Sequence, residues 1–193
     1  MKNSIGLSVL LCLVGCRATP KQTTATVMQA HEGDYLWMAP ASEKGIDGGG
    51  ELQIYVDAKT HPHARASAAK FTLGVGFQLP IHRHDKTEEF AYVLSGTGAA
   101  IVIEDGKEKE IPLAAGYVWY NPPGAWHAVR KTGDTQLSMF FVTVPNEKKG
   151  LLSFFRKVCA SPGKPGMVLT PEEFERIGRE HDLILRKSDS SND

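Results

Sequence analysis

The feature that most constrains this chain is a histidine pair, His82-x-His84, followed at short distance by Glu89 and then by Gly96. Successive side chains of a strand point to opposite faces, so two histidines two residues apart present both imidazoles on one face. A turn of four residues separates the pair from Glu89, which begins a second β-rich run. Two imidazole nitrogens and a carboxylate oxygen can therefore converge from neighbouring strands, and this is a ligand set for a first-row divalent metal.

A second histidine pair, His61 and His63, has no glutamate at the corresponding distance. Polar residues of this kind are mostly exposed in folded proteins. We therefore expect this pair to lie at the surface and to bind nothing.

A second block downstream gives the first pair its significance: Gly116, five residues, Pro122-Pro123-Gly124, two residues, and His127. Together the two blocks resemble the two motifs of the cupin family. The matching positions are Gly76, His82, His84, Glu89, Gly96, Gly116, Pro122, Gly124 and His127. Lys131 stands where the second motif usually has asparagine.

The resemblance covers about residues 70–145 and implies a small antiparallel barrel. It also implies that four side chains inside the barrel bind one divalent transition metal, which could be Fe, Mn, Ni, Cu or Zn. The implied ligands are His82, His84, Glu89 and His127.

The runs of β-forming residues agree with an all-β jelly roll, because they are short and no helical pattern separates them. The expected strands are 51–56, 71–77, 89–95, 99–104, 117–120, 125–130 and 137–144. Asp105-Gly106 predicts a hairpin turn. The motif pair occurs once, so we expect a single barrel, over residues 34–145.

The periodicity becomes helical after Pro145, and we expect a C-terminal helical extension over residues 146–187. Apolar residues recur between Leu151 and Val158, with Asn146 as an expected N-cap. A capping box at Thr170 and Glu173 predicts a second helix that ends near His181. The first helix could pack on the barrel or cover its mouth as a lid, and both interpretations remain open.

Residues 1–15 have the basic start and short apolar run of a secretory signal peptide. Leu13 to Cys16 resembles the lipobox of bacterial lipoproteins, which implies cleavage before Cys16, lipidation of its sulfur and anchorage to a membrane. Residues 16–33 predict a flexible tether. We therefore expect an extracytoplasmic lipoprotein, either on the periplasmic side of the outer membrane or at the cell surface.

Two further expectations concern partners. Lys and Arg together number 22 and equal Asp and Glu, so the chain has no net charge and predicts no nucleic-acid partner. Phe90, Tyr92 and Leu94 share the strand face opposite Glu89, and such an apolar face needs a cover. The terminal segments or a second copy in a homodimer could provide it, and both remain open.

Three imidazoles and one carboxylate leave two positions open on an octahedral ion, so a substrate could bind there. Arg83 and Arg130 lie at odd offsets from the histidines and should point away from the metal. The expected barrel wall is apolar or aromatic: Phe77, Val93, Trp119 or Tyr120, and Met139 or Phe141. An apolar pocket of this kind suits an aromatic or hydrophobic ligand.

The barrel followed by the pattern at 150–156 resembles small monocupins related to bacterial quercetin dioxygenases. This resemblance implies a metal-dependent dioxygenase acting on an aromatic or enolic small molecule, with Glu89 as both ligand and catalytic proton acceptor. A small-molecule-binding lipoprotein without turnover is the alternative interpretation, because a fold does not determine a function.

Overall fold

The computed structural model describes residues 25–38, 49–74, 77–164 and 167–187 of the 193-residue chain. The expected signal peptide and Cys16 lie outside the described residues. The elements in chain order are β1 (Asp34–Met38), β2 (Gly50–Val56), β3 (Ser67–Leu73), β4 (His82–Arg83), β5 (Glu88–Ser95), β6 (Thr97–Glu104), β7 (Lys107–Ala114), β8 (Val118–Asn121), β9 (His127–Lys131), β10 (Leu137–Val144), α1 (Leu151–Val158), α2 (Pro171–Glu180) and β11 (Ile184–Leu185).

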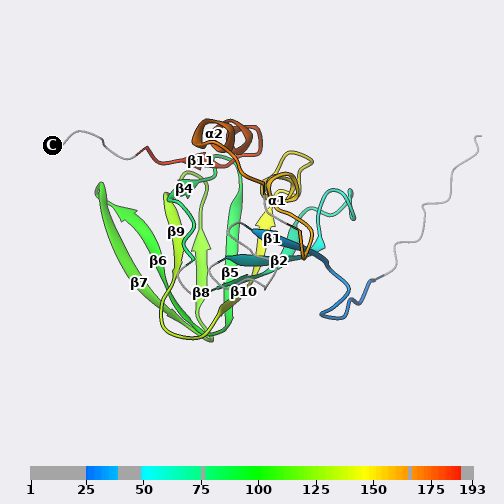
Figure 1. The fold of residues 1–193 in the computed structure, drawn as a ribbon, viewed down its shortest axis with the longest axis horizontal. Helices are drawn as coiled ribbons and strands as arrows, with labels where there is room; N and C mark the ends of the chain where they lie inside the picture. The colour runs from blue at the N-terminus through cyan, green and yellow to red at the C-terminus, as the bar shows by residue number, and fades with distance from the viewer. Residues whose placement is uncertain (1–24, 39–48, 75–76, 165–166, 188–193) are drawn as a thin grey trace, which may run out of the picture.

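The strands form two antiparallel sheets (Figure 1). The first sheet has the order β1-β2-β3-β10-β5-β8, and the second has the order β11-β4-β9-β6-β7. Neighbours within a sheet are often far apart in the sequence, as where β10 lies between β3 and β5. The described residues include only two short helices, so the all-β jelly-roll prediction is confirmed.

The core lies between the two sheets and is filled by every second residue of the strands. Ala91 and Val93 of β5 are buried, whereas their neighbours Phe90 and Tyr92 are exposed. Gly96 closes this strand with φ near +80°, and a Cβ there would fall on the backbone of Gln136. Only glycine accepts both that conformation and that close approach.

In Figure 1, α2 lies above β4, and α1 lies to the right of it, next to β1. The buried residues of α1 join the barrel core: Leu151, Leu152, Phe154 and Phe155. The expectation that Asn146 is the N-cap is wrong, because Gly150 is the N-cap of α1. Asn146 instead accepts a hydrogen bond from Ser67 and donates to the carbonyls of His61 and Ala64, so it ties two loops together.

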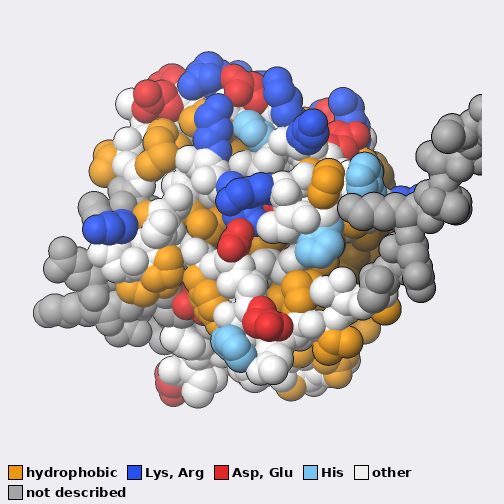
Figure 2. All heavy atoms as spheres, turned by 90° about the vertical axis from the view of Figure 1, so that its right-hand side faces the viewer, with side chains coloured by type: hydrophobic (Ala, Val, Ile, Leu, Met, Phe, Trp, Pro, Cys, Tyr) orange, Lys and Arg blue, Asp and Glu red, His pale blue; other side chains and the backbone are white. Residues whose placement is uncertain are grey.

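The capping box at Thr170 and Glu173 is confirmed, with Pro171 in the first turn of α2. The outer face of this helix is charged and carries two i,i+4 ion pairs, Arg176 with Glu180 and Arg179 with Glu175. Figure 2 shows basic and acidic side chains gathered at the top, the level of α2 in Figure 1. The helix is thus solvated on one side and packed through Ile177 on the other.

Some strands differ from expectation. The strand expected to reach Phe77 ends at Leu73, and β1 and β11 were not expected. Strand β7 follows the hairpin turn predicted at Asp105-Gly106. Strand β1 pairs with β2 throughout its length, from Asp34 opposite Ile54 to Met38 opposite Gly50. These elements form because a partner strand lies beside them, which local propensity does not show.

The outer face of the first sheet is apolar and only partly covered by the described chain. Phe90, Tyr92 and Leu94 are 42%, 47% and 45% exposed. Toward β2, Ala30 of the expected tether accepts hydrogen bonds from Gln53 and Tyr55. None of the described helices is both long and apolar enough to cross a bilayer.

Candidate metal centre

The candidate site lies between the two sheets, where β4 and β9 of one sheet and β5 of the other turn polar side chains inward. His82 of β4 is directly opposite His127 of β9, and His84 follows β4 by one residue. The three imidazoles are buried, and one nitrogen from each lies within 4.8 Å of the others. The sequence prediction that these histidines converge agrees with this geometry.

Backbone carbonyls fix the orientation of each imidazole. His82 Nδ1 lies 2.8 Å from the Pro80 oxygen, His84 Nδ1 lies 2.6 Å from that of Asp182, and His127 Nδ1 lies 2.9 Å from that of Ala125. A carbonyl only accepts, so each Nδ1 must carry the proton and donate it. Each Nε2 is thereby left with a free lone pair, the tautomer that a metal requires.

Glu89 of β5 approaches the same point from the other sheet. Its Oε2 lies 3.7 Å from His84 Nε2 and 3.5 Å from His127 Nε2. Its side chain is 16% exposed, whereas that of His84 is 1% exposed, so solvent reaches the cluster on the Glu89 side. Glu88 points to the opposite face, where its carboxylate accepts from the Tyr120 hydroxyl.

The protonation states also suit a metal. Burial lowers the pKa of His82 well below 6.5, and repulsion from His127 and His84 lowers it further. Burial likewise lowers the pKa of His84. Burial would raise the pKa of Glu89, but the interaction with His127 and the charges of the other imidazoles outweigh it and lower that pKa to about 2. Near neutral pH the imidazoles of His82 and His84 are therefore neutral and the Glu89 carboxylate is ionised.

Buried nitrogen atoms in this cluster have no partner in the protein. His84 Nε2 and His127 Nε2 are inaccessible and make no hydrogen bond. An unsatisfied buried polar atom costs about 1–3 kcal/mol, so a native protein normally supplies it with a partner. A divalent cation would satisfy both nitrogens, and three nitrogens with one oxygen form a donor set suited to such an ion.

A backbone hydrogen bond joins the turn at residues 122–124 to the segment that carries His82 and His84. Gly124, with φ near +83°, donates its N–H to the His84 carbonyl oxygen at 2.6 Å. Trp119 packs edge-on against the His127 ring, with the ring centroids 5.7 Å apart. Thus the turn at 122–124 holds both histidine segments together, as well as directing His127 inward.

Two residues that the sequence analysis did not identify belong to this site. Asn121 of β8 lies directly opposite Glu89 of β5, and its buried Nδ2 has no partner. The sequence could have predicted its inward position, because residues two apart on a strand share a face and Trp119 was expected to point inward. Asp182 contacts His84 from the C-terminal segment, and no sequence spacing indicates this contact.

The cations near the motifs do not enter the site. Arg83 pairs with Asp85 and lies over the Trp126 ring, and Arg130 pairs with Glu110. Lys131 is buried at the far end of β9 from His127. Its Nζ donates to the backbone carbonyls of Thr132 and Gly133, which follow the strand. The prediction that Arg83 and Arg130 point away from the metal agrees with these contacts.

Of the residues expected in the barrel wall, Val93, Met139 and Phe141 are buried in the core and Trp119 packs against it, whereas Tyr120 is exposed. Of the second histidine pair, His63 is exposed, and neither His61 nor His63 belongs to the metal-site cluster.

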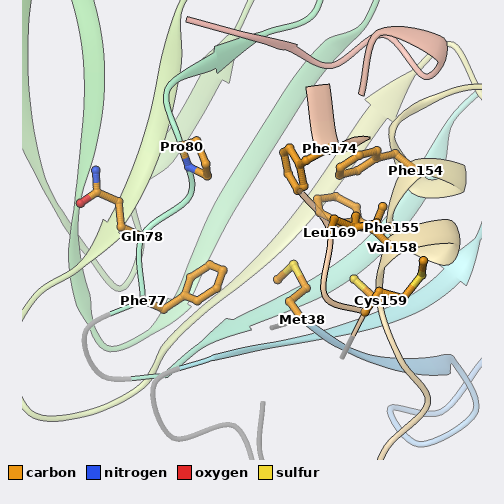
Figure 3. A pocket seen from close by; sticks show the side chains of 11 residues that line it. Met38, Phe77, Gln78, Pro80, Phe154, Phe155, Val158, Cys159, Leu169 and Phe174 are labelled. Atoms are coloured by element: carbon orange, nitrogen blue, oxygen red, sulfur yellow. The ribbon is translucent and has the colours of Figure 1, made fainter. Parts of the chain in front are cut away.

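A separate apolar cavity of about 340 Å³ lies between the barrel and the helical extension (Figure 3). Phe77 and Pro80 line one side, and Phe154, Phe174 and Cys159 line the other. None of the four candidate ligands lines it. Burial raises the pKa of Cys159 to about 12, so its thiol is inert near neutral pH and acts as a small hydrophobe.

A comparison with known families agrees with the geometry, because the model described as "Cupin domain" matches residues 69–143. Residues 69–143 therefore form a cupin domain. An oxalate-binding protein of Thermotoga maritima is 28% identical to this cupin over 127 residues, which cover 64% of this chain and 98% of that one.

Solved structures show the same likeness. A predicted oxalate decarboxylase of Thermotoga maritima has a TM-score of 0.52 and 25% identity, with 62% of this cupin and 99% of that chain covered. The oxalate decarboxylase of Lactobacillus farciminis, solved with formate, is 28% identical, with a TM-score of 0.46 over 51% of this cupin and 29% of that chain.

Proposed function

We propose that this cupin binds one divalent transition metal through His82, His84, His127 and Glu89, and that the metal site takes up a small oxygen-rich anion. The observation that carries this proposal is the pair of buried, unpartnered Nε2 atoms that face an ionised carboxylate. Fe, Mn, Ni, Cu and Zn all accept this donor set. Four protein donors leave positions on such an ion for further oxygen ligands.

The ligand class follows from the groups around the metal. No described cation enters the site, so the metal itself must supply the positive charge that an anion needs. Asn121 Nδ2 adds a neutral donor beside Glu89. A small dicarboxylate fits both features, and the relative named as an oxalate-binding protein supports this choice.

The experiment measures metal and ligand binding in sequence. Purified protein is analysed for bound metal, stripped, and reloaded with each of the five ions, and binding of oxalate and other small acids is then followed by calorimetry. We expect oxalate to bind only the loaded protein. Asn121→Leu should weaken oxalate binding by about 1.5–3 kcal/mol, roughly 10- to 150-fold, and leave metal affinity unchanged. Oxalate binding to the stripped protein would contradict the proposal.

A second candidate function is dioxygenase activity on an aromatic or enolic substrate. Trp119 beside His127 and the ionised Glu89 carboxylate favour it, since an aromatic wall can hold a flat ring and Glu89 can accept a proton from a substrate hydroxyl. The metal would lower the pKa of that bound hydroxyl. Oxygen uptake by loaded protein with flavonols, catechols and diketones tests this candidate, and its absence with all five ions would leave the binding function.

We also propose a homodimer formed through the outer face of the first sheet. The apolar face of Phe90, Tyr92 and Leu94 continues onto Phe140 of β10, which lies opposite Tyr92. Contiguous exposed apolar surface of this kind marks interaction sites. A second copy presents the same apolar face and would cover it reciprocally.

Anchorage through Cys16 to a bacterial membrane, outside the cytoplasm, remains a proposal that rests on the lipobox pattern. Cys16→Ser should release processed protein from membranes, and Cys159→Ser is the matched control because that thiol is buried and outside the lipobox. Processed Cys16→Ser protein that still sediments with membranes would contradict it.

A further inference from the structure

The segment after α2 returns to the metal-site loop from 98 residues away. Helix α2 ends at Glu180, Asp182 adopts a left-handed conformation with φ near +61°, and the chain then enters β11. Strand β11 pairs with β4, with Leu185 directly opposite the ligand His82. Figure 1 shows α2 and β11 above β4.

Asp182 contacts every residue of the loop from His84 to Thr87. Its backbone oxygen accepts from His84 Nδ1 at 2.6 Å. Its carboxylate accepts from the backbone N–H groups of Asp85, Lys86 and Thr87 at 2.9, 3.1 and 2.9 Å, and from the Thr87 hydroxyl at 2.8 Å. One residue therefore orients a candidate ligand and satisfies three consecutive amides of the loop that leads to Glu89.

We propose that Asp182 is a positioning residue for the metal site, and this inference rests on the proposed metal-binding function. The loop of residues 85–87 sets the distance between His84 and Glu89, which must approach one ion from different sheets. If the loop amides were free, several loop conformations would be open, and metal binding would have to select one. The Asp182 carboxylate makes that selection in advance.

The second contact acts on the imidazole itself. The Asp182 carbonyl holds the proton of His84 on Nδ1, so Nε2 remains available to the metal. Such partners outside the direct ligands typically change metal affinity by about 10- to 100-fold. The helical extension thus contributes to the metal site through this turn, in addition to packing on the core.

Two variants distinguish the contribution of the Asp182 carboxylate from that of its backbone carbonyl. Asp182→Gly accepts the positive φ and keeps the carbonyl but removes the carboxylate, and Asp182→Asn keeps one acceptor oxygen and also tolerates this φ. Asp105→Gly is the matched control, because Asp105 has φ near +49° in the β6–β7 hairpin, away from the site.

The probe is Co²⁺ in the full chain, with affinity measured by chelator competition and coordination followed by the visible spectrum. We expect Asp182→Gly to bind Co²⁺ about 10- to 100-fold more weakly, with an altered spectrum. Asp182→Asn should recover part of the loss, and Asp105→Gly should equal wild type. A structural role alone would not change the spectrum, and Ile54→Val, buried in β2, controls for lost stability.

Hydrogen exchange of the amides of residues 85–87 in metal-free protein gives the second readout. Asp182→Gly should exchange faster at these three amides, while the β2–β3 amides stay protected. Wild-type affinity and spectrum in Asp182→Gly would overturn the positioning role, whereas wild-type protein that binds no Co²⁺ would overturn the proposed function instead. If Asp182→Gly does not fold, Asp182→Asn decides the question by the same two measurements.

Discussion

The two faces of the sheet formed by β5 and β10 differ in what they contact, although the residues alternate along the same strands. The inner face carries Glu89, which joins the candidate metal site, and Val93, which is fully buried. The outer face carries Phe90, Tyr92 and Leu94, which remain exposed. The inner face therefore forms the core and the candidate site, whereas the outer face leaves large apolar side chains exposed.

Neighbouring residues therefore make matched pairs for testing this division. Glu89 and Glu88, and likewise Phe141 and Phe140, are chemically alike and differ in the face that they occupy. His61 and His63, which lie outside the site, provide a control for substitutions of the buried histidines.

The largest effect should come from removing two buried imidazoles. His84→Ala/His127→Ala should abolish metal binding at concentrations that saturate wild type, a greater loss than the roughly 10- to 100-fold caused by losing a supporting partner. The matched control His61→Ala/His63→Ala should bind normally. Metal analysis after dialysis checks both, and full occupancy of the first double variant would disprove the site.

The next prediction compares how much a phenylalanine on each face of the sheet contributes to the free energy of unfolding. Phe141→Ala should lower the free energy of unfolding by about 3–5 kcal/mol, because it leaves a cavity in the core. Phe140→Ala should cost about 1 kcal/mol, since it removes mainly the contact with Tyr55. Urea unfolding measures both, and equal losses would contradict the division.

Association should depend on the outer face only. Tyr92→Glu/Phe140→Glu should weaken the proposed dimer by at least about 2 kcal/mol, roughly 30-fold, since a central apolar pair becomes charged. Ile111→Glu, an exposed position on β7 of the other sheet, is the control. Sedimentation velocity gives the outcome, and monomeric wild-type protein would remove the dimer proposal.

A smaller effect should distinguish the two carboxylates. Glu89→Gln should weaken metal binding roughly tenfold, about 1.4 kcal/mol, because the amide oxygen still reaches the site but carries no charge. Glu88→Gln should leave the affinity unchanged, since its side chain meets Tyr120 on the outer face. Calorimetric titration would refute the assignment if the two variants bound equally.

The smallest effect concerns the pH dependence of the metal-free protein. The pKa values of His82 and His84 are lowered in the folded state by burial, so below about pH 6.5 the unfolded chain binds more protons. The free energy of unfolding should therefore fall as the pH drops from 7 toward 5. His82→Gln/His84→Gln should flatten this dependence, and an unchanged slope would contradict the pKa shifts.

Much of the fold could be predicted from the sequence because the strands alternate. The expected runs at 51–56, 89–95 and 137–144 correspond closely to β2, β5 and β10. The two-residue β11 and the short β1 could not be predicted, since so few residues carry no usable period and only a neighbouring strand defines them.

The candidate site divides in the same way. The spacing of His82, His84 and Glu89 predicted a common metal site, and the resemblance to the cupin motifs implied His127 as a fourth ligand. The period of two separated Glu89 from Glu88. Only the tertiary structure brought Asp182 to His84 and placed Asn121, with its unpartnered amide, opposite Glu89. The physical reason is that these contacts depend on backbone amides and carbonyls and on the pairing of distant strands. Every residue has the same backbone groups, so only the folded chain determines which of them meet.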